Sequence, residues 1–78
     1  MVILKRIIKN SNQIEADYYP ENGNIFGHLV VDIISGEISS ITRAENDRIG
    51  AYAYHAKKQL LRVSALDVTP KESRTIWY

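Results

Sequence analysis

Hydrophobic and polar residues alternate along the first half of the chain with the period of two that is typical of β-strands. In the clearest segment Ile14, Ala16 and Tyr18 share one face, while charged residues lie between them. Aliphatic and β-branched runs come before and after this segment, separated by turn-forming residues such as Asn22-Gly23. The pattern predicts four strands, at about residues 2–9, 13–19, 25–34 and 37–41.

The hydrophobic period changes after the fourth predicted strand. Thr42 is followed three residues later by Glu45, which is the capping-box pattern, so we place the start of a helix at Thr42. Apolar residues then recur at steps of three and four, and Pro70 cannot continue a helix. These features predict a helix over about residues 43–65. Its apolar face is expected to comprise Ile49, Tyr52, Ala53, Ala56, Leu60 and Val63.

The last residues of the chain are strong strand formers, and they predict either a short strand at 74–78 or a tail packed against the domain. Strands joined by short turns usually pair with their neighbours in sequence. A length of 78 residues suits one domain, so residues 1–78 are expected to form a single unit. The predicted fold is α+β, an antiparallel β-meander of three to five strands with one amphipathic helix packed on one face.

Composition narrows the function classes. Ten Lys and Arg residues against nine Asp and Glu give a net charge of +1, so overall charge favours neither a polyanion nor a polycation. The absence of cysteine excludes disulfides, thiolate metal sites and cysteine nucleophiles. Lys5 and Arg6 interrupt the apolar N-terminal run, and no run reaches the roughly 18 residues of a membrane span. We therefore expect a cytoplasmic protein without membrane contact.

Few residues suggest enzyme chemistry. The two histidines lack a second histidine at metal-ligand spacing, and the serines and glycines form no nucleophile elbow or phosphate loop. His28 is expected to be half-buried on a strand with a hydrogen-bonded ring, and His55 to be solvated on the outer side of the helix. We predict no catalytic, cofactor-binding or metal-binding residue, and an enzyme ranks third among the function classes.

An interaction surface is predicted on the outer face of the helix. At 100° per residue Arg48, His55, Lys58 and Arg62 fall together opposite the apolar face, and no acidic residue lies between Asp47 and Asp67. Such a surface either contacts phosphates or simply faces solvent. The aromatic pair Trp77-Tyr78 either packs against one end of the core or anchors an interface. The predicted interaction surface comprises Arg48, His55, Lys58, Arg62, Trp77 and Tyr78.

A resemblance covers nearly the whole chain. It is carried by Tyr18-Tyr19-Pro20-Glu21 with the following Asn22-Gly23 turn, by Val31-Asp32-Ile33-Ile34-Ser35-Gly36-Glu37-Ile38, by Tyr54-His55-Ala56-Lys57 and by Ile76-Trp77-Tyr78. On these segments the chain resembles a group of small single-domain bacterial proteins of unknown function that combine a strand meander, one helix and a C-terminal Trp-Tyr. The resemblance implies a bacterial cytoplasmic origin and no activity or cofactor.

The function classes are therefore ranked as follows. The first is a non-catalytic binding or assembly module that acts through protein–protein contact or self-association, because free strand edges invite pairing. The alternative is a small nucleic-acid-binding protein that uses the basic outer face of the helix, with exposed aromatic rings for stacking.

Overall fold

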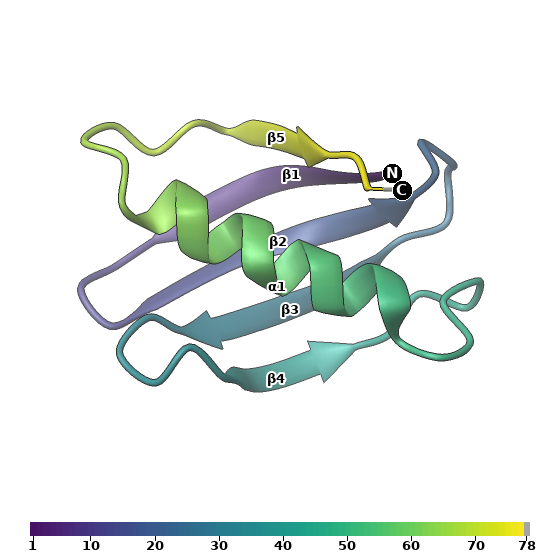
Figure 1. The fold of residues 1–78 in the computed structure, drawn as a ribbon, viewed down its shortest axis with the longest axis horizontal. Coiled ribbons are helices and arrows are strands. Elements are labelled where there is room, and N and C mark those ends of the chain that lie inside the picture. Colours follow the sequence, from purple (N-terminus) through teal and green to yellow (C-terminus); the bar gives the residue numbers. More distant parts are fainter. Residues whose placement is uncertain (78) are drawn as a thin grey trace.

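A computed structural model describes residues 1–77 and shows a five-stranded antiparallel sheet with one helix across one face (Figure 1). The strand order is β4-β3-β2-β1-β5, so the last strand of the chain lies beside the first. The predicted α+β fold, with an antiparallel sheet and one packed helix, is confirmed. The elements are β1 (Val2–Lys9), β2 (Gln13–Pro20), β3 (Gly27–Asp32), β4 (Ile38–Thr42), α1 (Ala51–Ser64) and β5 (Glu72–Thr75).

Turn residues set the ends of the central strands. Glu21 and Asn22 have positive φ angles of 54° and 62°, and the N–H of Gly23 donates to the carbonyl of Pro20, as in the turns that suit hairpins. The third strand is shorter than the predicted 25–34, because the Asp32 carboxylate accepts the N–H groups of Ile34 and Ser35 and bends the chain.

The end of the chain also differs from the prediction. The last strand begins at Glu72 rather than 74 and ends at Thr75, so Trp77 leaves the sheet. Tyr78, part of the predicted strand and of the predicted surface, lies outside the described residues.

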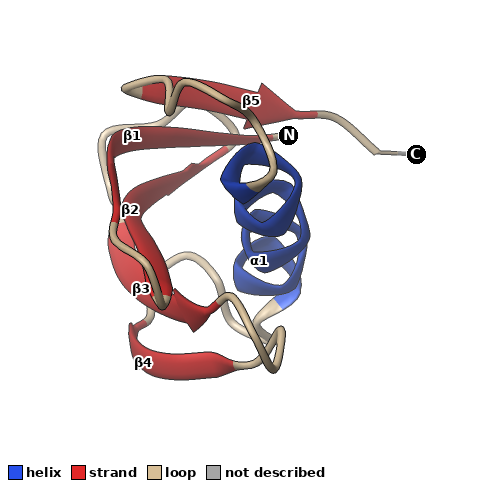
Figure 2. Cartoon of the chain, turned by 90° about the vertical axis from the view of Figure 1, so that its left-hand side faces the viewer, coloured by secondary structure: helices blue, strands red, loops and turns tan. Residues whose placement is uncertain are grey.

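The core lies between the sheet and α1, which form the two layers seen edge-on in Figure 2. Four of the six residues predicted for the apolar face of the helix are buried, and Tyr52 is half-buried. The prediction for Ile49 is wrong, since it precedes the helix and is 89% exposed. The core residues are Val2, Leu4, Ile7, Ile14, Ala16, Tyr18, Leu29, Val31, Ala44, Ala53, Ala56, Leu60 and Val63.

The predicted helix start is wrong. Thr42 belongs to β4, residues 43–50 form a loop, and α1 begins after Gly50, whose φ of 76° suits a glycine. The capping role falls to the buried Asp47, whose carboxylate accepts the N–H groups of Tyr52 at 3.2 Å and Ala53 at 3.0 Å. The Tyr18 hydroxyl donates to the same carboxylate at 3.0 Å, so this cap is fixed to β2.

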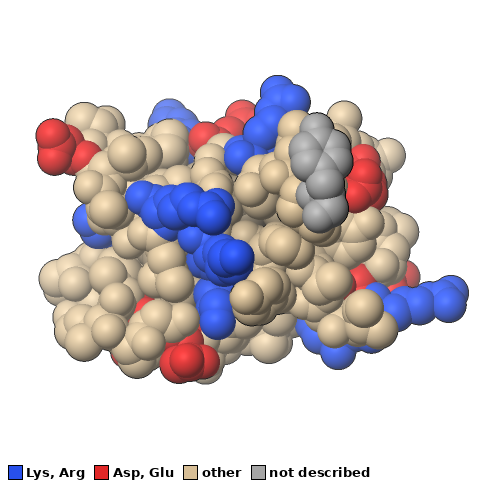
Figure 3. Space-filling view, in the orientation of Figure 1, with Lys and Arg blue, Asp and Glu red and all other residues tan. Residues whose placement is uncertain are grey.

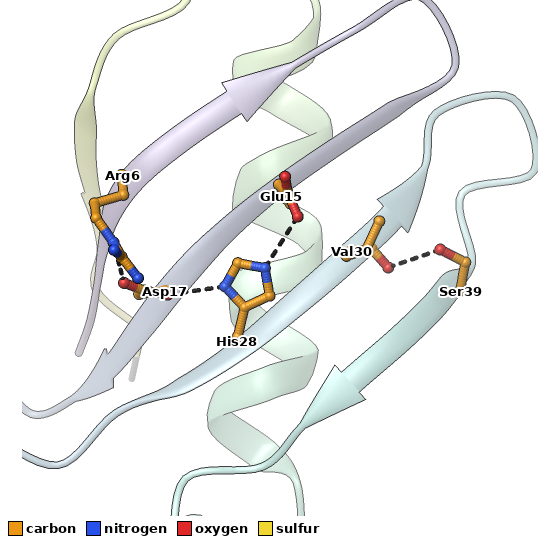
Figure 4. A network of polar contacts seen from close by, with 6 residues as sticks. All are labelled: Arg6, Glu15, Asp17, His28, Val30 and Ser39. Carbon is orange, nitrogen blue, oxygen red and sulfur yellow. Dashed lines mark hydrogen bonds and ion pairs between the residues drawn. The ribbon is translucent and has the colours of Figure 1, made fainter.

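Both edges of the sheet have features that limit pairing with another chain. Within residues 1–77, β5 is the edge strand beside β1, and it is four residues long with exposed Glu72 and Arg74. On β4, the register with β3 shifts between Val30 and Val31, and the Ser39 hydroxyl donates to the Val30 carbonyl at 3.3 Å (Figure 4). Short edges, charges and irregular register all disfavour edge-to-edge association.

Candidate functional site

The outer face of α1 carries three of the residues predicted for an interaction surface. His55, Lys58 and Arg62 are spaced at i, i+3 and i+7, so the helix places them on one side. Figure 3 shows Lys and Arg side chains gathered across this side of the molecule. We call the whole surface the aromatic–basic patch, and it comprises Tyr54, His55, Lys57, Lys58, Arg62 and Trp77.

Trp77 reaches the patch from the segment after β5. Its ring stacks on His55 with centroids 3.8 Å apart and an interplanar angle of 14°, and it meets the edge of Tyr52 at 5.5 Å. The pairing of β5 with β1 brings this segment beside the helix. Trp77 is half-buried against the core, so it combines packing with a surface position. The structure thus joins two predicted residues, Trp77 and His55, that lie 22 positions apart in the sequence.

His55 is not the solvated residue that the sequence predicts. Its ring is half-buried under Trp77, and the pKa of His55 is lowered by this burial and by the charges of Lys58, the N-terminal ammonium and Arg62. A pKa below the ordinary 6.5 leaves the imidazole neutral at pH 7. A neutral ring can stack on the indole without the cost of desolvating a charge.

Tyr54 is the exposed aromatic ring of the patch, with 52% of its surface accessible. The ammonium groups of Lys57 and Lys58 lie 5.5 and 5.4 Å from its ring centroid, within cation–π range. Arg62 donates to the side-chain oxygen of Gln59. Within residues 1–77 no carboxylate lies within ion-pair distance of Lys57, Lys58 or Arg62. The patch therefore combines an accessible ring with positive charge that the described chain leaves uncompensated.

Arg48 does not belong to this patch. The prediction placed it on a helix starting near residue 43, but it lies in the loop before α1, where its carbonyl accepts a hydrogen bond from Arg43. Helical spacing does not single out Lys9, whose ammonium donates to the carbonyl of Ser64 at 2.7 Å. This contact joins residues 55 positions apart and places a positive charge at the C-terminal end of the helix, which the helix dipole favours.

A second polar cluster lies on the face of the sheet opposite α1 (Figure 4). The register of β2 and β3 places Asp17 opposite His28, and their side chains meet at 2.8 Å. The other ring nitrogen of His28 lies 3.0 Å from Glu15. Arg6, at an irregularity of β1 with a φ of 54°, donates to Asp17 at 2.6 Å. The sequence-based expectation that His28 is half-buried with a hydrogen-bonded ring is confirmed.

The cluster shifts the ionisation of its members in opposite directions. The hydrogen bond to Asp17, followed by that to Glu15, raises the pKa of His28 against the effect of burial. Burial alone would raise the pKa of Asp17, but the hydrogen bonds from Arg6 and His28 outweigh it, and the net pKa is lowered. The imidazolium form of His28 donates from both nitrogens to carboxylates, so neither nitrogen is free to accept a proton or bind a metal.

Two open depressions of about 320 and 430 Å³ lie beside β1 and β5, and Lys5 and Glu72 line both of them. Over residues 1–77, no group of three His, Cys, Asp or Glu side chains is arranged to hold a metal ion. In the same range, α1 is too short and too polar to cross a membrane.

No protein-family model matches the chain, and neither the curated proteins nor the solved structures contain a match to it.

Proposed function

We propose that this protein is a non-catalytic binding module that holds a negatively charged macromolecule on the aromatic–basic patch. One observation carries the proposal: Lys57, Lys58 and Arg62 have no carboxylate partner within residues 1–77. Cations that a protein leaves uncompensated on one surface attract and orient an anionic partner.

Comparison with the other surfaces of the molecule supports the aromatic–basic patch as the binding site. On the sheet face opposite α1, Arg6, Asp17, His28 and Glu15 satisfy one another, so this cluster offers a partner little unbalanced charge. The sheet edges carry the protective features described above, which disfavour self-association by strand pairing. Two copies facing each other through the patch would bring like charges together, which is costly.

The proposal also includes that the protein is not an enzyme and that it acts in a bacterial cytoplasm. Both ring nitrogens of His28 are occupied by carboxylates, which supports a non-catalytic role for this residue. We place the module in a bacterial cytoplasm, as the resemblance implies, and the cysteine-free sequence is compatible with a reducing compartment.

Heteronuclear NMR titration at ~50 mM salt tests the proposal, since electrostatic binding is strongest at low salt. Poly-L-glutamate and a single-stranded oligonucleotide serve as polyanion probes. At least one probe should shift the backbone signals of residues 54–62 and the indole signal of Trp77. The double variant Lys58→Glu, Arg62→Glu should keep the fold and lose the shifts. If neither polyanion shifts these signals, or if the double variant responds unchanged, the proposal is wrong.

A further inference from the structure

We infer that the partner is single-stranded nucleic acid, with a base stacked on Tyr54 and phosphates held by Lys57, Lys58 and Arg62. This inference rests on the proposed function, because it names the macromolecule that the patch would bind.

The arrangement of ring and cations distinguishes nucleic acid from an acidic protein. The Tyr54 ring is half exposed, and two ammonium groups lie about 5.5 Å from its centroid. A nucleotide presents a flat π-face and a phosphate in the same unit, so it can occupy both features at once. An acidic peptide supplies carboxylates for the lysines, but most of its residues offer no ring to stack on Tyr54.

The patch already contains a series of contacting rings beside which a base can lie. Tyr54 meets His55 edge-on at 5.4 Å, and His55 stacks on Trp77 at 3.8 Å. Every base has a π-face, so stacking on such a series tolerates any sequence. In a duplex these faces are covered by neighbouring base pairs, whereas in a single strand they are accessible. An exposed stacking ring therefore favours a single strand.

The patch is short. Tyr54 and Arg62 are eight residues apart on α1, which corresponds to about 12 Å along the helix axis. This length suits a small site, on the order of four nucleotides. If three phosphates are contacted, the logarithm of the binding constant should fall with the logarithm of salt concentration with a slope of about −2. Binding should then weaken roughly 20-fold between 50 and 200 mM salt.

The test uses the full chain and a fluorescently labelled octathymidylate, with anisotropy to measure affinity. Trp77 is the only tryptophan, so its intrinsic fluorescence reports independently on the patch. Tyr54→Leu keeps an apolar side chain but removes the ring, and it should weaken binding by about fivefold or more. Tyr54→Phe keeps the ring and should bind like the parent protein. Circular dichroism checks that each variant is folded.

Charge variants test the phosphate contacts. Arg62→Gln should reduce the salt slope by about 0.7. Arg48→Gln and Lys71→Gln remove the same charge from exposed positions outside the patch, and both should leave the affinity and slope nearly unchanged.

Each contrary result has a distinct meaning. If poly-L-glutamate binds the patch and octathymidylate does not, the inference fails while the proposed function stands. If neither polymer binds at ~50 mM salt, both fail. Equal affinity of Tyr54→Leu and the parent protein would overturn the stacking contact. Tighter binding of a duplex than of the single strand would overturn the choice of a single strand.

Discussion

Gly27 at the start of β3 controls how closely that strand approaches the loop before the helix. A Cβ atom added there would lie 2.6 Å from the backbone nitrogen of Ala44 and 2.6 Å from the ring of Tyr18, and still closer to the carbonyl oxygen of Thr42. Two of these neighbours are backbone atoms, which cannot rotate away. Gly27→Ala must therefore push the strand and the loop apart.

The loss in free energy of unfolding can be estimated from the hydrogen bonds that this displacement breaks. The nitrogen of Ala44 donates to the Tyr18 hydroxyl, which in turn donates to the capping carboxylate of Asp47. Overpacking costs about 1–3 kcal/mol, and a buried polar group left without its partner costs about 1–3 kcal/mol more. We expect Gly27→Ala to lower the free energy of unfolding by about 2–6 kcal/mol. A chain of this length has a total of roughly 4–12 kcal/mol, so the loss is a large fraction of the stability.

Urea denaturation followed by circular dichroism measures this loss, with Gly23→Ala as the matched control. At Gly23 an added Cβ would meet the carbonyl oxygen of Pro20 at 3.4 Å, an ordinary contact. Because alanine restricts the unfolded chain, Gly23→Ala should be neutral or stabilising by about 0.5 kcal/mol. A Gly27→Ala variant within 0.5 kcal/mol of the parent protein would refute the close approach of β3 to the loop.

Three further predictions concern titration and capping. Because the pKa of His28 is raised, its stabilising contribution is full below pH 6.5 and is lost as the pH rises through the folded-state pKa. The free energy of unfolding, measured across this range, should therefore fall as the pH rises. A His28→Gln variant with the same pH profile would contradict this prediction. The His55 signal in NMR should titrate with a midpoint below 6.5, and a midpoint above that of His28 would contradict the assignment of the two environments. Asp47→Ala should lower the free energy of unfolding by about 2–4 kcal/mol, because it removes the helix cap and leaves the Tyr18 hydroxyl without its acceptor. Asp47→Asn keeps an acceptor oxygen and should lower the free energy of unfolding less in the same urea assay.

The fold was predictable to the extent that it depends on local periodicity. Alternation with a period of two located four strands, and the three-and-four spacing identified Ala53, Ala56, Leu60 and Val63 as the buried face of the helix. The start of the helix was not predictable in this way. Thr42 and Glu45 form a valid capping box locally, but the actual cap is Asp47, which a tyrosine 29 residues earlier in the sequence holds in place. Tertiary contacts of this kind override a local signal.

In the candidate site, too, local spacing was predictable and contacts between distant segments were not. Helical spacing places His55, Lys58 and Arg62 on one side of α1 in the prediction and in the structure, since their positions depend only on the helix itself. The error over Arg48 follows directly from the wrong helix start. The contact of Trp77 with His55 depends on the docking of β5 against β1, and no local pattern indicates it.

The position of β5 has a consequence for how the aromatic–basic patch forms and is lost. This strand pairs only with β1 within the described chain, at the opposite end of the sequence, so the loop that its docking closes spans almost every residue. Contacts of such high sequence separation are slow to form, and a four-residue edge strand is among the first elements to open locally. Opening of β5 would carry Trp77 away from His55 while the hairpins of the meander stay paired. The aromatic–basic patch would then lose the stacked pair of Trp77 and His55, while Tyr54, Lys58 and Arg62 would keep their places on α1.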